Sequence, residues 1–437
     1  MPEVNRYNLR MFWTPVSRSI GTSPGGVVMP EERLSWPRTI GIGLQHVVAM
    51  FGATVLVPLL TGFPPATTIL FSGIGTIVFL LVVRNKVPSY LGSSFAFIAP
   101  VVAAQSQGGI PAALGGIAAA GLVFFLVGLL VEKRGFRLVE ALMPPVVTGS
   151  IVALIGLNLA PVARDNFVKQ PGIAGVTLAA ILVICVAVRG FLGRLAIFLG
   201  VLAGYACAMA MGQVDRSGVA LAAWFGLPPL QSPVFDPRAI VLMVPVVVVL
   251  IAENTGHVKA VAAMTGRNLD RSLGRAFMGD GLATMLAGLG GGSGTTTYAE
   301  NIGVMAATRV YSTAAYAVAA VTAILLGLCP RFGALIGTIP PGVLGGATTI
   351  LYGMIAVLGA RIWIEARVDF RDPVNLLTAG IALIVGAADY TVHLGSFEFN
   401  GIALGSFGAI AVYHLLRKLG PAPTATPDPA RDAPPED

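Results

Sequence analysis

The chain has 437 residues, of which 55% are hydrophobic and only 11% are charged. Soluble domains contain roughly 25% charged residues, so this composition excludes an ordinary soluble protein and indicates a polytopic membrane protein. The net charge of +7 is not evidence for a nucleic-acid partner, because cytoplasmic loops of membrane proteins are rich in Lys and Arg. The scattered Cys residues predict neither a disulfide framework nor a metal site, and no signal peptide is evident.

Fourteen membrane spans are predicted from stretches without charged residues, since one crossing needs about 20 mainly apolar residues. The two longest stretches are each divided in two by turns, at Gly62–Pro65 and Gly108–Pro111. A segment at 217–235 is a candidate fifteenth span, but its prolines and Trp224 favour an interfacial loop. The predicted spans lie at 39–83 (two), 87–131 (two), 141–163, 172–188, 195–213, 237–258, 273–291, 292–308, 310–330, 334–360, 373–389 and 399–416.

The basic residues predict the orientation of these spans. With both termini in the cytoplasm, all but a few of the 28 Lys and Arg residues lie on the cytoplasmic side, as the positive-inside rule requires. The exceptions are Arg164, Lys169, Arg216, Arg238 and Arg331. We therefore expect a multi-pass protein of the plasma (inner) membrane.

The same topology sets the domain boundaries. Residues 1–37 form a cytoplasmic segment, 38–213 the first seven spans, 214–236 an outer linker, 237–418 the second seven spans and 419–437 a disordered cytoplasmic tail. Because seven is odd, the two sets have opposite orientations. Met143–Gly149 is similar to Ile339–Gly346 at the fifth span of each set, and 91–100 is similar to 291–301 at the third. Chance likeness of Gly-rich segments explains either pair alone; together they favour an inverted repeat, whose interrupted spans indicate a transport site.

The third and tenth spans are predicted to be broken. Four Gly and three Thr before Glu300 disfavour a helix, and extended backbone is tolerated at membrane depth only where it pairs with protein or lines a cavity. Glu300 stands at the break, far from any Lys or Arg, which indicates a functional carboxyl; the alternative is an acid that reaches the membrane surface near a helix end. If the two breaks cross, they offer two half-helix N-termini to a polar ligand, and Phe95 beside carboxyls suits a flat heterocycle.

Five further polar residues lie in predicted spans. Glu253 and His257 are four apart on one helix face and could exchange a proton, since burial disfavours a charged Glu and His titrates near neutrality; alternatively His257 caps the helix end. Asp280, between two Gly residues, could bind substrate or hold the broken tenth span through backbone amides, and we favour the second role. Gln45 and His46 could join helices or line the cavity, with His46 assigned to structure.

Several long motifs carry a resemblance over roughly residues 31–416. They are LQHVVAMFGATVLVP (Leu44–Pro58), VPSYLGSSFAFI (Val87–Ile98), AENTGH (Ala252–His257) and TTYAENIGVMAATRVYS (Thr296–Ser312). The sequence resembles the nucleobase–ascorbate transporter family (nucleobase:cation symporter-2) in its uracil branch. Residues 26–34 and 274–305 resemble more closely still the pyrimidine permeases of the bacterial Rut pathway.

The resemblance implies an all-α polytopic membrane protein with two inverted seven-span repeats and short strands in spans 3 and 10. It implies a core domain (spans 1–4 and 8–11) that slides against a gate domain (spans 5–7 and 12–14), in a homodimer. It also implies a proton as the coupling ion, with no metal or other cofactor.

The resemblance further implies a set of site residues. Glu253 and Glu300 would bind the pyrimidine edge, Phe95, Tyr298, Ala299 and Ala53 would line the site, and Glu253 with His257 would couple the proton. The supporting residues would be Asp280, Asn301, Gln45 and His46. The uracil-permease pattern has His, Gly and Asn where this chain has Asn254, Ala299 and Asp280.

The sequence thus predicts proton-coupled import of uracil or a related pyrimidine. Transport of a purine such as xanthine or urate is the first alternative, because an Asp at position 280 is similar to the purine branch. An anion transporter of the related sulfate-transporter fold is more remote, since that family typically carries a C-terminal soluble domain. A membrane enzyme is unsupported, because no metalloprotease, nucleophile-elbow or phosphate-loop motif is present.

Overall fold

The computed structural model describes residues 13–16, 26–189, 191–395 and 397–419, which are mostly helical. The predicted C-terminal tail lies outside the described residues apart from its first position. Helices α1 (Trp36–Thr61) and α2 (Pro65–Val82) are separated at Gly62, whose φ of 73° suits Gly. Helix α3 (Ile98–Arg134) leaves helical geometry at Gly108 and Gly109. Both predicted divisions of the long apolar stretches are therefore confirmed.

The remaining elements follow in chain order, and many begin with Pro at a first helical position, where its missing N–H costs nothing. They are β1 (Thr14–Pro15), β2 (Glu32–Arg33), β3 (Leu91–Ser93), η1 (Phe95–Phe97), α4 (Arg137–Leu142), α5 (Pro145–Asn158), α6 (Ala160–Lys169), α7 (Pro171–Ala187), α8 (Phe191–Arg194), α9 (Ala196–Ala210), α10 (Ser217–Leu221), α11 (Pro237–Met243), α12 (Val246–Thr265), η2 (Asp270–Ser272), α13 (Leu273–Gly290), β4 (Thr295–Thr297), α14 (Ala299–Thr308), α15 (Thr313–Gly327), α16 (Pro330–Gly337), α17 (Pro341–Glu365), α18 (Pro373–Ala387), β5 (Val392–Leu394), β6 (Phe397–Phe399) and α19 (Gly401–Leu419).

Among the described residues, 7 helices are long and apolar enough to cross a membrane, or up to 8 if the bent pair α15–α16 forms one span. Three shorter apolar helices, α7, α9 and α18, fall below that length. The count of fourteen stays a prediction. The two numbers differ because both halves of α3, on either side of the break at Gly108 and Gly109, count as one helix, because α7, α9 and α18 are short, and because the segment from β4 to α14 is only partly helical.

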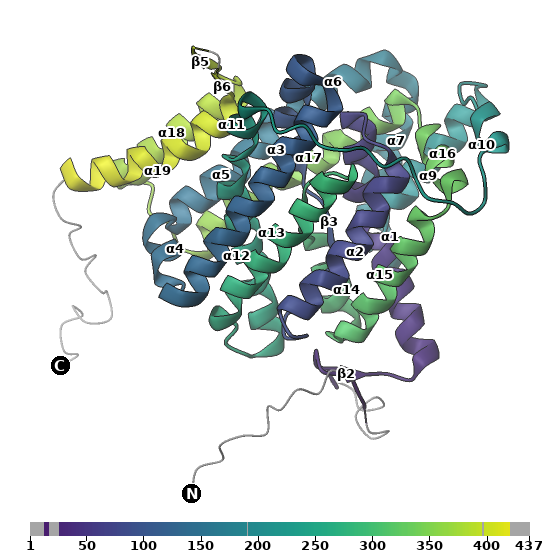
Figure 1. Ribbon diagram of the computed structural model, residues 1–437, viewed down its shortest axis with the longest axis horizontal. Helices are drawn as coiled ribbons and strands as arrows, with labels where there is room; N and C mark the ends of the chain where they lie inside the picture. The colour runs from purple at the N-terminus through teal and green to yellow at the C-terminus, as the bar shows by residue number, and fades with distance from the viewer. Residues whose placement is uncertain (1–12, 17–25, 190, 396, 420–437) are drawn as a thin grey trace, which may run out of the picture.

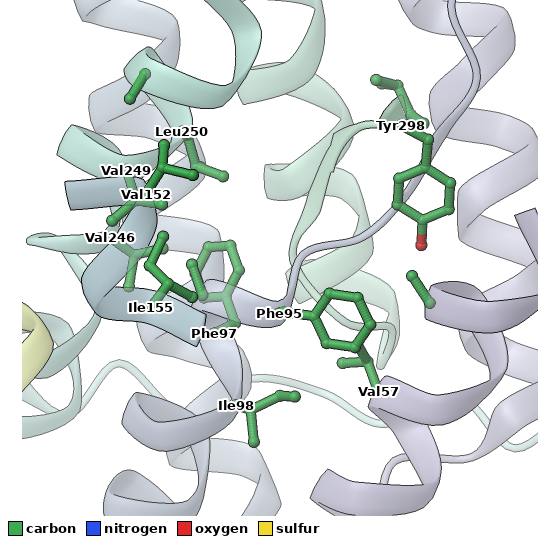
Figure 2. Close-up of a cluster of buried hydrophobic side chains, with 14 of the residues drawn as sticks. Val57, Phe95, Phe97, Ile98, Val152, Ile155, Val246, Val249, Leu250 and Tyr298 are labelled. Atoms are coloured by element: carbon green, nitrogen blue, oxygen red, sulfur yellow. The ribbon is translucent and has the colours of Figure 1, made fainter. Parts of the chain in front are cut away.

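The helices form two groups according to which helices pack together. In the first group, α13 packs against α3 and α2, while α15 packs against α2 and α1, and α11 packs against α3. In the second group, α17 packs against α5, α6 and α7, and α18 packs against α19 and α5. Contacts between the groups are fewer, for example where α12 meets α5. Figure 2 shows this junction, where Val152 and Ile155 of α5 face Val246 and Val249 of α12.

Helices α3 and α13 approach through small residues at seven-residue spacing. Gly281 faces Gly121, and a Cβ on Gly281 would lie 2.4 Å from the Phe125 nitrogen and 2.8 Å from the Gly121 carbonyl oxygen. Gly274 and Gly288, one heptad away on either side, meet α3 as closely. Within a membrane, close backbone contact of this kind replaces the hydrophobic effect as the attraction between helices.

The N-terminal strap (residues 26–34) contacts the α14–α15 junction and the C-terminal end of α12. Val28 bridges Val310, the Pro30 carbonyl accepts the Thr313 hydroxyl at 2.8 Å, and the Glu32 carbonyl accepts the Ser312 hydroxyl. Arg267, after α12, pairs with Glu31 of the strap. The strap therefore joins the α14–α15 junction to the end of α12.

The Glu31–Arg267 pair predicts a small pH-dependent stabilisation. The Arg267 guanidinium lowers the pKa of Glu31 below its usual 4.5, so the contribution is present at neutral pH and is lost as the pH falls through that lowered pKa. Because both side chains are about half exposed, we expect Glu31→Gln to reduce the free energy of unfolding by less than about 1 kcal/mol at pH 7. Thermal melts at pH 7 and pH 3 test this; an equal difference at both pH values would contradict it.

The linker 214–236 forms no helix of membrane length: apart from the five-residue α10 it runs extended over the first helix group (Figure 1). Its backbone is attached at several points, including the Pro229 carbonyl to the Thr67 hydroxyl and the Val234 amide to the Pro111 carbonyl. Trp224 is 73% exposed and stacks under the Arg331 guanidinium. The segment is therefore not a fifteenth helical span, and its location at the membrane interface stays a prediction.

Candidate functional site

Two short strands meet at the breaks of the predicted third and tenth spans. β3 pairs with β4 in antiparallel register, with Gly92 opposite Thr296, and the Ser94 amide continues the pairing to the Gly294 carbonyl. The predicted strands are thus confirmed, and their backbone groups bond each other at depth, as a membrane interior requires. A Cβ on Gly92 would lie 2.4 Å from the Tyr298 ring, so only Gly fits there.

Glu253 of α12 is fixed by hydroxyl groups from both broken segments. Thr296 donates to its Oε2 at 2.8 Å, and Ser94 donates to the same oxygen at 3.3 Å. Within the described part of the chain, the other oxygen, Oε1, accepts no hydrogen bond. Glu253 is only partly buried, so one carboxyl oxygen is held by protein and the other is available to a ligand.

Glu300 lies in the first turn of α14, which packs against α12, the helix that carries Glu253. Apart from its own backbone amide, its carboxyl has no hydrogen-bond partner among the described residues. It is also partly exposed. The structure therefore places the two predicted carboxyls on packed helices, each with unused acceptor capacity.

Two aromatic side chains of the predicted site belong to the broken segments: Phe95 follows Ser94, and Tyr298 precedes Glu300 by two residues. Tyr298 is buried, and its hydroxyl donates to the Ser93 carbonyl at 3.0 Å and contacts the Thr54 hydroxyl at 3.0 Å. Phe95 points toward Val57 of α1 (Figure 2) and meets the Tyr352 ring of α17 edge-on, with centroids 5.6 Å apart. Phe95 thus joins the broken third segment to the second helix group.

Asp280 is fully buried and completely used by structural hydrogen bonds. Its Oδ1 accepts the Thr295 hydroxyl at 2.7 Å, and its Oδ2 accepts the Asn254 side-chain amide at 2.7 Å. The favoured prediction, that Asp280 holds the broken tenth segment, agrees with these contacts. The expected partners were backbone amides, whereas the observed ones are side chains, because the segment presents a Thr hydroxyl toward α13.

A family model described as a permease family, Xan_ur_permease, matches residues 37–395. The chain belongs to this permease family. A protein of Escherichia coli (strain K12) described as "Putative pyrimidine permease RutG" is 50% identical over 95% of this chain and 98% of its own. The uracil permeases of Bacillus caldolyticus and of Escherichia coli (strain K12) are 42% and 41% identical, over 88% and 92% of this chain and 94% and 96% of theirs.

Solved structures share the fold of this permease at low identity. The transmembrane domain of a cyanobacterium bicarbonate transporter, BicA, matches 86% of this chain and 96% of its own, with a TM-score of 0.56 and 17% identity. The murine Solute Carrier 26 family member A9 anion transporter matches 89% and 70%, with a TM-score of 0.68 and 10% identity. Together with the apolar helices, these findings identify an integral membrane permease, not an enzyme.

No hydrogen bond joins Glu253 to His257 in the described part of the permease. His257 lies in the middle of α12 and is 4% exposed, so it does not cap the helix end. Neither ring nitrogen has a hydrogen-bond partner there, although the Pro88 backbone approaches the ring. The imidazole and the carboxyl share a helix, but Glu253 turns toward Ser94 and Thr296 instead.

The remaining predicted residues lie around this centre. Asn301 donates to His46 Nδ1 at 2.9 Å, and the His46 ring stacks on Tyr316 with centroids 4.2 Å apart, in keeping with a structural His46. The Gln45 side-chain oxygen is buried without a partner among the described residues. Ala53 is buried beside Thr54 in α1. The backbone of Ala299 begins α14, while its side chain lies outside the described residues.

Sequence reasoning missed the hydroxyl and amide groups that position the carboxyls of Glu253 and Asp280. These are Ser94, Asn254, Thr295 and Thr296, while Thr54 contacts the Tyr298 hydroxyl. The sequence did carry one signal for these contacts. Successive side chains of a strand point to opposite faces, so neighbouring residues of the run Thr295–Thr297 must contact different partners. Thr295 accordingly reaches Asp280, and Thr296 reaches Glu253.

This arrangement predicts that Asp280 is needed as an acceptor and not as a charge. In Asp280→Asn, the amide oxygen can accept from Asn254 while its NH₂ donates to Thr295, which also contacts the Thr284 hydroxyl. We expect Asp280→Asn to keep solute uptake within about threefold of the parent, whereas Asp280→Ala leaves buried donors unpaired and costs about 2 kcal/mol or more of stability. Thermal melts and uptake in proteoliposomes measure both; equal loss in the two variants would contradict the prediction.

Proposed function

We propose that the permease imports uracil or a closely related pyrimidine nucleobase by proton-coupled symport. The observation that carries this proposal is the pair Glu253 and Glu300, which lie on the packed elements α12 and α14 and each keep an unused carboxyl oxygen. Uracil presents alternating N–H donors and C=O acceptors on one flat edge. A carboxylate can accept from an N–H, and a protonated carboxyl can donate to a C=O. The names of the relatives, pyrimidine and uracil permeases, support the same class of solute.

The broken segments support the binding mode. The N-terminus of α14 follows β4 directly, so its first backbone N–H groups, which have no partner within the helix, face the end of the strand pair. Phe95 offers an aromatic edge or face on the side of α17. A neutral, planar, polar-edged ring matches this combination better than an inorganic anion, which two carboxyls would repel.

Uracil is favoured over a purine as the transported base. The sequence feature that suggested a purine is Asp280, and that carboxyl is buried and bonded to Thr295 and Asn254. It therefore has no acceptor capacity directed to a ligand in this arrangement.

The proposed mechanism is alternating access in a fourteen-span homodimer of the inner membrane, with both termini cytoplasmic. The first helix group would be the core domain, and the second group would be the gate domain. Support comes from the packing of the helices within each group and the sparse contacts between them. Glu253, with His257 on the same helix, would take up the coupled proton when the base binds.

Binding of uracil, thymine, xanthine and urate to the purified protein tests the proposal. A ligand that binds only the folded state raises Tm, so we expect stabilisation by uracil that is stronger at pH 5.5 than at pH 7.5. Uptake of labelled uracil into proteoliposomes should then follow an inward proton gradient and collapse with a protonophore. Stabilisation by xanthine or urate alone would reassign the solute, and uptake indifferent to the gradient would refute the coupling.

A further inference from the structure

A cavity of about 540 Å³ lies apart from the carboxyl pair, between the two helix groups. One wall is α12, from Ile251 to Ala263, and the opposite walls are the α4–α5 region and the end of α17. Its volume is in the range of small-molecule sites, which run from about 300 to 1,000 Å³. Ala252, which precedes Glu253 in α12, lines one end of the cavity, whereas neither Glu253 nor Glu300 lines it.

The walls of the cavity suit a neutral, flat molecule. They are mostly apolar and include Phe136 and Met143. The charged groups at its margin are already paired: Lys259 with Glu140 at 3.4 Å, and Glu365 with Arg361 at 2.6 Å. These residues therefore offer no unpaired charge to a charged ligand, which favours a neutral one.

Thr255 lines this cavity and carries an unused hydroxyl. Its Oγ1 is buried and has no hydrogen-bond partner among the described residues, so it reaches a ligand in the cavity once the side chain rotates about χ1. Threonine in a helix commonly donates to the carbonyl four residues earlier, and Thr265 of the same helix does so to Val261 at 2.8 Å. Thr255 does not, so a buried polar atom is left for a ligand to satisfy.

We propose that this cavity is a second, weaker nucleobase site, in which the Thr255 hydroxyl bonds one edge of the base against apolar walls. The inference rests on the proposed function. The cavity extends along α12 from Ala252 to Ala263, toward the end of the helix that pairs with the N-terminal strap. A base released from Glu253 toward that end enters the cavity before it reaches solvent.

Equilibrium binding of radiolabelled uracil to the purified full-length protein tests this site. We expect two components in the parent protein. Thr255→Val, which keeps the side-chain shape, should weaken the second component roughly fivefold to tenfold and leave the first unchanged. Glu300→Gln should do the reverse. Thr265→Val is the matched control, because its hydroxyl is bonded within the helix and does not line the cavity.

Two further variants separate the hydroxyl from folding effects. Thr255→Ser retains the donor and should retain the second component, whereas Ala260→Leu fills the cavity and should remove it. A single uracil site that Thr255→Val leaves unchanged would overturn this inference and leave the proposed function intact. Absence of any uracil binding would overturn both, and a second component unaffected by Ala260→Leu would place it elsewhere on the protein.

Discussion

The Glu300→Gln variant is expected to fold like the parent protein and to bind uracil roughly 10- to 100-fold more weakly. The carboxyl of Glu300 has no structural partner besides its own backbone amide among the described residues, so its replacement breaks no contact between helices. A glutamine cannot alternate between a charged acceptor and a protonated donor. Uracil affinity should therefore fall while Tm without ligand changes by no more than about 2 °C.

Calorimetric titration and thermal melts on the same preparations measure these two quantities. Asp165→Asn is the matched control, because it removes an exposed carboxylate beside Arg164, far from the strand pair in sequence. Unchanged uracil affinity in Glu300→Gln would refute the assignment of this residue to the site. A large fall in Tm without ligand would instead show that Glu300 stabilises the fold.

The Gly281→Ala variant is expected to lose about 2–3 kcal/mol of stability, although it adds one methyl group. The added Cβ would lie 2.4 Å from the Phe125 backbone nitrogen, and backbone atoms cannot turn aside as a flexible side chain can. Helices α3 and α13 must separate, which disturbs the carboxyl of Asp280 next to the substitution. We expect a lower Tm and a lower yield of protein that is monodisperse in detergent.

Gly380 of α18 provides a control in which substitution by Ala is not expected to lower stability. A Cβ there meets nothing within 4 Å, so Gly380→Ala should be neutral or stabilise by up to about 1 kcal/mol through the better helix propensity of Ala. Denaturation of both variants in the same detergent gives the comparison. Equal stability of Gly281→Ala and the parent would show that the α3–α13 contact adapts.

The sequence predicted those features whose cause is local. Gly62 and Gly109 mark helix breaks because their positive φ favours glycine, and the Thr run before Glu300 marks a strand because it disfavours a helix. The pairing of distant groups was not predictable in the same way. Glu253 meets Ser94 and Thr296 across 159 and 43 residues, and only the packed helices determine which of the neighbouring hydroxyls reaches it.

The hydrogen-bond partners of polar side chains were also hard to predict from the sequence. Glu253 and His257 satisfy the four-residue spacing of a helix face, yet the carboxyl bonds the broken segments and the imidazole stays without a partner among the described residues. Spacing along a helix shows which side chains can meet, whereas competing donors on other elements decide which ones do. The N-terminal strap shows the same limit, since its partners near Thr313 lie far away in sequence.

The strap also imposes an order on the biogenesis of the protein. The Pro30 carbonyl and the Thr313 hydroxyl that it accepts are 283 residues apart, and Trp13 is 300 residues from the same Thr313 hydroxyl. At translation rates of about 5–20 residues per second, the N-terminal residues wait roughly 15 to 60 seconds for these partners. The first half of the chain therefore enters the bilayer before the N-terminal strap has contacted its partners. The N-terminal strap can attach only after the ribosome has synthesised α14, the helix that contains Glu300.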